Sequence, residues 1–336
     1  MSASGEGGRG TVALDVPLAA GSVATYQIAE LVQVMSGQEP QRLRLVAKGI
    51  DRDGVPFEVA PLEIGLVNEA RMGGGPDAGL LAAGDIAVCG AASTEATAKL
   101  LDRLPGTVLA LGDDVYPSGT AEQFANCYAP TWGRHRARTS PSPGNHEYDV
   151  SGATPYYAYF GGAAGPAGLG YYSFNLGAWH VLSLNSNIAA QPGSPQYEWV
   201  RSDLDASASV CTLAYWHHPV FSSGGNGNIS QMREIWRLLD SHHAEVVLVG
   251  HDHDYERFAP QDADGTATAG GVREFVVGTG GAPLRPIGVV KPNSQIRQNQ
   301  TWGVLRLMLR AGTYSWEFVP IDGQSFRDFG TTACVP

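Results

Sequence analysis

The stretches VVLVGHDH (residues 246–253) and VLALGDDVY (residues 108–116) decide the fold class of this 336-residue chain. In each, an apolar run stops at a glycine and is followed directly by His, Asp or Tyr side chains. An apolar run of this length beside a glycine is typical of a fully buried parallel strand. Because open α/β sheets bind ligands just beyond the carboxyl ends of their strands, the two stretches predict a metal site at such an edge.

Three further segments bring the same kinds of side chain. Leu80–Gly84 leads to Asp85, and Thr212–Trp216 leads to a pair of histidines and a proline. The loop Pro143–Glu147 contains Asn and His but has no apolar run directly before it. Taken singly, each segment has an ordinary explanation, such as a helix cap or a turn. Five segments in one chain favour a shared site.

The candidate ligands are carboxylate and amide oxygens, a phenol and imidazoles. Such donors suit Fe, Zn, Mn and similar ions better than metals that prefer thiolates. Seven candidates are too many for one tetrahedral Zn, and they fit two ions that share a carboxylate. The seven are Asp85, Asp113, Tyr116, Asn145, His217, His251 and His253.

In their order along the chain, these segments resemble the five blocks of the calcineurin-like metallophosphoesterases. The blocks are Gly84-Asp85, Gly112–Tyr116, Gly144–Glu147, His217–Pro219 and Gly250–His253. The Tyr three residues after Asp113 resembles the purple acid phosphatase branch. Most other branches have a His at the position of Ala87, and His253–Arg257 also looks like the purple acid phosphatase segment. The resemblance covers roughly residues 80 to 320.

The resemblance implies a role for each candidate. Asp85, Tyr116 and His253 would hold a first metal, expected to be Fe(III). Asn145, His217 and His251 would hold a second metal, expected to be Zn, Mn or Fe(II). Asp113 would bridge the two ions, and His146 would assist the leaving group without binding metal.

The substrate pocket is less well defined by the sequence. Its possible residues are His218, Asn226, Asn228 and Tyr255. Plant-type members carry further histidines in the loop after the fourth block, where this chain has the two asparagines. His218 either lines the pocket or only flanks a ligand.

The expected activity is hydrolysis of phosphate monoesters of acid phosphatase type. A hydroxide on the metals would attack phosphorus in line, with Asp113 and His146 in the catalytic centre. Two alternatives stay open. One is a phosphodiesterase acting on nucleotide or cyclic-nucleotide esters with the same metals. The other is a non-catalytic, metal-stabilised binding protein, which would require a broken site.

The predicted fold is a four-layer α/β/β/α sandwich with a small N-terminal β-rich domain. Alternating apolar residues around Val12–Val16, Leu43–Ala47 and Phe57–Val59 predict N-terminal strands. We therefore expect a flexible tail at 1–10, a β-rich domain with a Gly-rich linker at 11–75, and a catalytic domain at 76–336. Strands near Val304–Leu309 and Tyr314–Val319 have no helix between them and predict an antiparallel end to the chain.

The predicted helices have clear sequence signals. Spacing of apolar residues predicts helices at Gln196–Leu204 and Gln231–Ser241, and another is expected to start near Glu122. Thr94 is expected to cap a helix that ends at Leu104, before Pro105-Gly106.

Composition restricts the possible partners. The net charge is −11, and only three lysines occur, with no basic run. This pattern argues against a nucleic-acid-binding surface. A small phosphorylated substrate is what the resemblance implies. No stretch reaches the ~18 apolar residues needed to span a bilayer.

The cell compartment stays open at this point. The first ten residues show no secretory signal, which leaves a trimmed secreted protein and a cytoplasmic one as alternatives. Cys89, Cys127, Cys211 and Cys334 could form two disulfides, with three possible pairings, or stay as thiols. The oligomeric state is open as well.

Overall fold

The computed structural model describes residues 77–335, except residue 167, together with four short strands between residues 41 and 66. The predicted tail at 1–10, the strand at Val12–Val16 and the linker before residue 77 lie outside the described residues. The chain divides into two compact units between Gly73 and Gly74. The domain limits given above stay a prediction.

The first unit contains two small antiparallel strand pairs. β1 (Gln41–Leu45) pairs with β4 (Leu62–Leu66), and β2 (Lys48–Ile50) pairs with β3 (Pro56–Glu58). Two of these strands coincide with the alternating apolar residues around Leu43 and Phe57, so the sequence predicted β structure there correctly.

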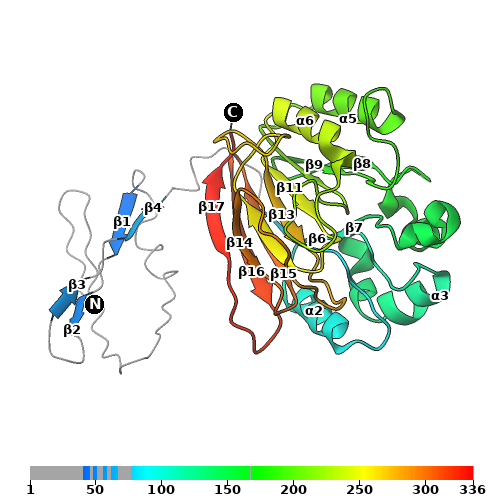
Figure 1. Ribbon diagram of the computed structural model, residues 1–336, viewed down its shortest axis with the longest axis horizontal. Helices are drawn as coiled ribbons and strands as arrows, with labels where there is room; N and C mark the ends of the chain where they lie inside the picture. The colour runs from blue at the N-terminus through cyan, green and yellow to red at the C-terminus, as the bar shows by residue number, and fades with distance from the viewer. Residues whose placement is uncertain are drawn as a thin grey trace. The chain divides into compact units, whose positions relative to one another are not determined.

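The second unit contains two sheets (Figure 1). The first is formed by β5 (Ala78–Ala83), β6 (Thr107–Leu111), β7 (Thr139–Ser142), β15 (Gly303–Arg310), β16 (Thr313–Pro320) and β17 (Phe329–Ala333). Their order is β17-β16-β15-β5-β6-β7. β5, β6 and β7 are parallel, whereas β15, β16 and β17 are antiparallel to their neighbours. The predicted antiparallel end of the chain is therefore confirmed.

The second sheet has seven strands. They are β8 (Tyr172–Leu176), β9 (Trp179–Ser183), β10 (Cys211–Tyr215), β11 (Val246–Val249), β12 (Tyr255–Phe258), β13 (Arg273–Val277) and β14 (Ser294–Gln298). Their order is β14-β12-β13-β11-β10-β9-β8, with β9, β10, β11 and β13 parallel. The apolar runs that opened the sequence analysis are thus parallel strands in both sheets.

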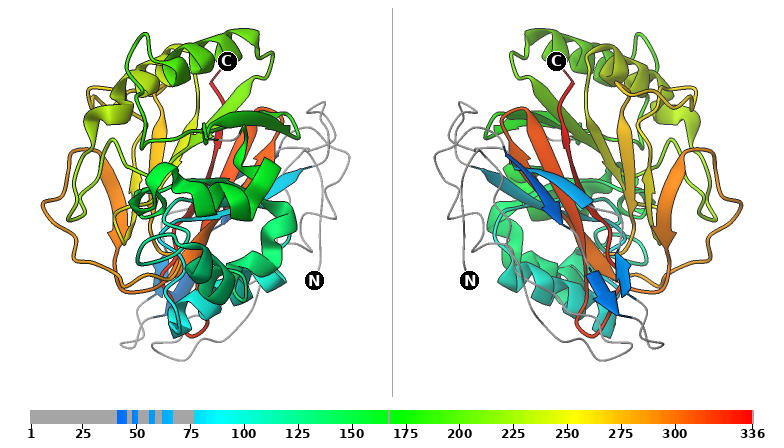
Figure 2. Two further views of the ribbon diagram at one scale, coloured as in Figure 1. Left: turned by 90° about the vertical axis from the view of Figure 1, so that its right-hand side faces the viewer. Right: turned by 90° about the vertical axis from the view of Figure 1, so that its left-hand side faces the viewer.

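Helices cover the outer faces of the two sheets (Figure 2). They are α2 (Ala92–Arg103), α3 (Ala121–Gln123), α4 (Thr154–Phe160), α5 (Pro195–Ala206) and α6 (Arg233–Ser241). α5 and α6 place Val200, Trp236 and Leu239 against the seven-stranded sheet, in a cluster that contains Leu182 and Val247. This layering confirms the predicted α/β/β/α class.

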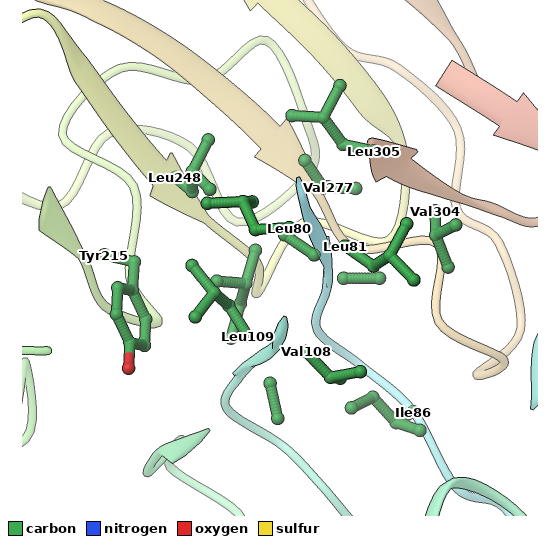
Figure 3. Packing of buried hydrophobic residues seen from close by; sticks show 14 of the residues in the cluster. Leu80, Leu81, Ile86, Val108, Leu109, Tyr215, Leu248, Val277, Val304 and Leu305 are labelled. Carbon is green, nitrogen blue, oxygen red and sulfur yellow. The ribbon is translucent and has the colours of Figure 1, made fainter. Parts of the chain in front are cut away.

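The main core lies between the sheets (Figure 3). Leu80 and Leu109 of the first sheet pack with Leu248 and Val277 of the second, and all four are fully buried. Burying a side chain of this size stabilises the fold by roughly 1.5–3 kcal/mol. The core therefore fixes the two sheets to each other, and with them the strand ends that carry the polar residues.

One strand was not predicted, and one helix cap was predicted wrongly. The Pro143–Glu147 loop follows a strand, β7, whose sequence TSPS has no apolar run, as the sequence analysis noted. α2 begins at Ala92, so Thr94 is not its N-cap. Instead the Thr94 hydroxyl donates to the Ile86 carbonyl (3.1 Å) and so ties the helix to the segment after β5.

All four cysteines form disulfides, Cys89–Cys127 and Cys211–Cys334. The sequence alone did not decide which cysteines pair, or whether they form disulfides at all. Cys127 lies in a π-helical turn, Phe124–Tyr128, which continues the predicted helix near Glu122. Among the described residues, no helix is long and apolar enough to cross a bilayer.

Candidate metal centre

Five strands from both sheets end at the same place. Asp85, Asp113 and Asn145 follow β5, β6 and β7 of the first sheet. His217 and His251 follow β10 and β11 of the second sheet. The site therefore spans both sheets, because the parallel strands of each present their carboxyl ends at this edge.

The first group of side chains surrounds the Tyr116 hydroxyl. That oxygen lies 2.8 Å from Asp85 Oδ1, 3.0 Å from Asp113 Oδ2 and 3.1 Å from His253 Nε2. His253 Nε2 is in turn 3.1 Å from Asp85 Oδ1. Four of the sequence-predicted residues thus meet within hydrogen-bond distance.

The second group surrounds His217. Its Nε2 atom is 3.3 Å from Asp113 Oδ2 and 3.2 Å from His251 Nδ1. Asn145, in the loop after β7, has a buried Oδ1 atom with no hydrogen-bond partner, which leaves a strong acceptor free in that loop. Asp113 Oδ2 therefore contacts both groups of side chains.

Backbone carbonyls orient two of the histidines. His217 Nδ1 is 2.8 Å from the Leu111 carbonyl, and His253 Nδ1 is 2.8 Å from the Pro283 carbonyl. With Nδ1–H donated to a carbonyl, each Nε2 lone pair points into the cluster, which is the usual arrangement of metal-binding histidines.

Three candidate ligands have left-handed backbone conformations. The φ angles are 57° for Asp85, 50° for Asp113 and 71° for His251. Non-glycine residues rarely adopt positive φ, and each instance costs of order 1–3 kcal/mol. Such conformations gather at functional sites, where the surrounding structure holds them in place.

A buried glutamate supports the Asp113 conformation. Glu147 Oε2 accepts hydrogen bonds from the Asp113 amide (3.0 Å) and the Gly144 amide (2.7 Å), and Oε1 accepts from the Asp114 amide (2.9 Å). A Cβ at Gly144 would lie 2.1 Å from Asp113 Oδ1, so only glycine allows this approach. Glu147 therefore joins the loop that bears Asp113 to the loop that bears Asn145.

The charges in the cluster call for cations. Burial raises the pKa of Asp85 and of Asp113, but His253 and His217 outweigh it and hold both carboxyl pKa values below their usual range. Burial lowers the pKa of His217, and the two carboxylates more than offset this and raise it to about 9. In the metal-free protein, positive charge on these imidazoles would offset the buried carboxylates. Bound metal ions would supply that charge instead and leave the imidazoles neutral, with their Nε2 lone pairs free to bind.

The donor set fits a metal pair. Asp85, Asp113 and His217 place ligand atoms within 4.8 Å of one another, as do His217, His218 and His251. The Asp85 and Asp113 carboxylates are buried, and Asn145 Oδ1 is a buried acceptor without a hydrogen-bond partner. A buried cation requires such donors, because a buried charge must be paired or coordinated.

His146 lies at the site but is turned differently from the other histidines. Its Nδ1 atom contacts the Pro117 carbonyl, and its Nε2 atom is 3.7 Å from Asp113 Oδ2. Its backbone amide donates to Asp113 Oδ1 (2.9 Å). The His146 side chain is 27% exposed, in contrast to the fully buried His217. His146 can therefore reach both the site and solvent.

Three of the four predicted pocket residues lie close to these loops. His218 packs against His251, with ring centroids 4.4 Å apart, and its Nδ1 is 2.8 Å from Ser186 Oγ. Asn226 is exposed, and its Nδ2 donates to the His251 carbonyl (2.8 Å). Asn228 is exposed, but its Oδ1 accepts from the Ser222 amide (2.9 Å) and stabilises its own loop.

The prediction that Tyr255 lines the substrate pocket was wrong. It is fully buried in β12, and its hydroxyl donates to Asp328 Oδ2 (2.7 Å), so it cannot contact a substrate. The sequence pattern next to His253 suggested a pocket residue, but the side chain points into the core beside Phe318.

Sequence reasoning missed several residues at or beside the site. Glu147 belongs to the third block, Gly144–Glu147, but nothing in its pattern showed that it binds three backbone amides. Ser186 and Arg285 lie beside the site and carry no signal in the sequence, because only the fold brings their loops there. A groove of about 600 Å³ beside β14 contains none of the candidate ligands.

Comparison with known proteins agrees with the fold and shows the family. Residues 79–255 match the family model of the calcineurin-like phosphoesterases, and the chain belongs to this family, whose members use a pair of metal ions. The chain is 30% identical over 202 residues to purple acid phosphatase 15 of Arabidopsis thaliana, covering 49% of this chain and 38% of that protein. It is 31% identical over 157 residues to the uncharacterized protein Rv2577 of Mycobacterium tuberculosis, covering 38% and 29%.

Two solved structures share the fold. A purple acid phosphatase from yellow lupin seeds (Lupinus luteus) superposes with a TM-score of 0.66 at 17% identity, covering 88% of this chain and 60% of that one. GAP50 of Plasmodium gives a TM-score of 0.61 at 12% identity, covering 77% and 90%. The matches to the two curated relatives span less than two fifths of each relative's length.

Proposed function

We propose that this protein hydrolyses phosphate monoesters with two metal ions held by the seven residues of the candidate centre. The observation that carries the proposal is the position of Asp113 Oδ2, which is 3.0 Å from the Tyr116 hydroxyl and 3.3 Å from His217 Nε2. One carboxylate oxygen that contacts both groups of donors is what two neighbouring ions would share.

Each group of donors would hold one ion. Asp85, Tyr116 and His253 would hold the first, for which we propose Fe(III). Asn145, His217 and His251 would hold the second, for which we propose Zn, Mn or Fe(II). When bound, such a pair supplies an activated water at ordinary pH and neutralises the charge on the phosphate oxygens.

His146 would handle the proton of the leaving group. The contact of Nδ1 with the Pro117 carbonyl fixes the ring and leaves Nε2 facing the site. From there Nε2 can donate a proton to the departing alkoxide, the task of a general acid. Asp113 would orient His146 as well, because it accepts the amide hydrogen of that residue.

The substrate would be a small phosphorylated molecule. Calcineurin-like relatives with phosphatase names support this, as does the excess of acidic residues, which gives no footprint for nucleic acid. A phosphodiesterase stays the main alternative, and a metal-stabilised binding protein the second.

One experiment separates the three functions. The protein is loaded with iron and zinc, its metal content is measured, and hydrolysis of p-nitrophenyl phosphate is compared with that of bis-p-nitrophenyl phosphate. The proposal expects faster turnover of the monoester. Faster turnover of the diester supports the phosphodiesterase, and no turnover at full metal content supports the binding protein.

A further inference from the structure

Arg285 lies beside the candidate centre and has no role in the proposed reaction. Its backbone is fixed on both sides: its amide donates to the His253 carbonyl (3.0 Å), and its carbonyl accepts from Asn299 Nδ2 (2.9 Å). The segment just before it supplies the Pro283 carbonyl that orients His253. The same loop therefore fixes the Arg285 backbone and orients the candidate ligand His253.

The Arg285 side chain extends toward the other ligand-bearing loop. Its Nη1 atom is 3.5 Å from Asn226 Oδ1. Asn226 is itself held in place, because its amide donates to Asp252 Oδ1 (2.8 Å) and its Nδ2 donates to the His251 carbonyl (2.8 Å). Asn226 thus places the guanidinium next to the segment His251–His253.

The charge of Arg285 is not neutralised within the described part of the chain. No carboxylate there lies within 4.0 Å of its guanidinium, whereas Arg257 pairs with Asp328 at 2.7 Å. Asn226 engages one nitrogen, at the limit of a hydrogen bond. Since a guanidinium has five N–H donors, most of the Arg285 donors stay available in an exposed position.

The Arg285 charge lies beside the segment that bears two candidate ligands, because the Arg285 amide donates to the His253 carbonyl and its guanidinium contacts Asn226. In a chain with a net charge of −11, an exposed cation at this place gives a local positive potential. Such a potential attracts anions to the edge of the site.

We propose that Arg285 binds a second oxyanion on the leaving group of the substrate, with Asn226 as its positioning residue. The preferred substrates are then phosphate monoesters or phosphoanhydrides whose leaving group carries another phosphate or a carboxylate. Guanidinium matches both groups with two parallel hydrogen bonds. This inference rests on the proposed phosphatase function and names its substrate class.

The predicted kinetic effect is specific. Arg285 would contact a part of the substrate that does not change during cleavage of the P–O bond. It would therefore bind the ground state and the transition state equally, and its loss would raise KM without lowering kcat. A residue that only stabilised the loop would change all substrates alike.

The test uses the metal-loaded full chain and three substrates. p-Nitrophenyl phosphate has no second anion on its leaving group, phosphoglycolate has a carboxylate, and ADP has a phosphate. Arg285→Gln is expected to raise KM for phosphoglycolate and ADP roughly tenfold, the value of one charged hydrogen bond, and to leave p-nitrophenyl phosphate unchanged. A rise for only one of the two anionic substrates identifies which oxyanion is bound. Arg285→Lys is expected to recover part of the preference.

A matched variant controls for charge. Arg201→Gln removes an exposed arginine on α5 that pairs with Glu198 within its own helix. It is expected to leave all three KM values unchanged. If Arg201→Gln and Arg285→Gln act alike, or if Arg285→Gln shifts all three substrates equally, the proposal is wrong.

A binding measurement separates this proposal from the proposed function. In the His146→Ala background, calorimetry measures the Kd of phosphoglycolate and of p-nitrophenyl phosphate with and without Arg285→Gln. A loss of about tenfold for phosphoglycolate alone supports the subsite even if turnover is absent. Equal losses for both ligands, or none, overturn it.

Discussion

The two halves of the candidate metal centre differ in the charge of their donors. In the proposed assignment, the first half has the Asp85 carboxylate and the Tyr116 phenol, which would become anionic on a metal, and His253 would complete it. The second half would have the neutral amide of Asn145 and two imidazoles. Anionic oxygen donors favour a more highly charged, harder ion. The comparison therefore predicts a trivalent ion in the first half and a divalent ion in the second.

Asp113→Asn tests whether the halves depend on a shared carboxylate, and has the largest expected effect. Removing the charge that contacts both groups should weaken both metals and abolish most activity. The measurement is metal content by mass spectrometry together with p-nitrophenyl phosphate turnover. Wild-type metal content and turnover in this variant would rule out the two-metal model.

His146→Ala separates ligands from the residue that assists the leaving group. It should keep both metals and lower kcat by roughly 10²–10⁴-fold, the usual contribution of general acid–base catalysis. Metal content and kcat are measured on the same sample. A variant that loses metal would make His146 a ligand and our assignment wrong.

Glu147→Gln tests the connection between the Asp113 and Asn145 loops. The side-chain amide would place hydrogens against backbone donors, so Asp113 and Asn145 should lose their relative positions. We expect metal affinity to fall roughly 10–100-fold, as for other residues that orient ligands. Metal affinity is measured by competition with a chelator.

Glu245→Gln is the matched control for Glu147. Glu245 is also buried, and it accepts from the Thr212 amide (2.6 Å) at the start of β10, the end away from the centre. Its substitution should leave metal affinity unchanged. Equal loss of affinity in the two variants would mean that Glu147 acts only through overall stability.

Tyr116→Phe affects the first half alone. A phenolate on Fe(III) absorbs visible light by charge transfer, so the iron-loaded wild type should be coloured and the variant colourless, with the second metal retained. The visible spectrum and iron content of both proteins decide this. A wild type that holds Fe(III) without colour, or an equally coloured variant, would remove Tyr116 from the ligand set.

The raised pKa of Glu245 predicts a small effect of pH on the free energy of unfolding. This residue lies outside both halves of the candidate centre. Burial raises its pKa to about 7, although the amides of Thr212 and Val335 lower it. The folded protein thus binds this proton more tightly than the unfolded chain. The resulting stabilisation is complete below the unfolded pKa near 4.5 and is lost as pH rises through about 7.

Glu245→Gln stays neutral and should lack this pH dependence. Between those two pH values the wild type should lose on the order of 2 kcal/mol of unfolding free energy relative to the variant. Urea unfolding at matched metal content, with both disulfides oxidised, gives the measurement. Parallel stability curves for the two proteins would contradict the assigned pKa.

The sequence alone determined the class of the fold and the residues that meet at the centre. Apolar runs such as 246–249 can be buried on both faces only in a covered sheet, and residues directly after such strands must lie at its edge. β7 escaped notice because TSPS has no apolar pattern, and Tyr255 was misplaced because spacing does not give the direction of a side chain.

Only the tertiary structure decided how these residues contact one another. The pairing of the four cysteines, the Glu147 bonds to the Asp113 and Asp114 amides and the meeting of Arg285 with Asn226 join segments between 33 and 123 residues apart. No local pattern encodes such contacts, because only the folded sheets bring these segments together. The sequence specified which donors reach the edge, and the packing of the sheets placed Asp113 between the two halves.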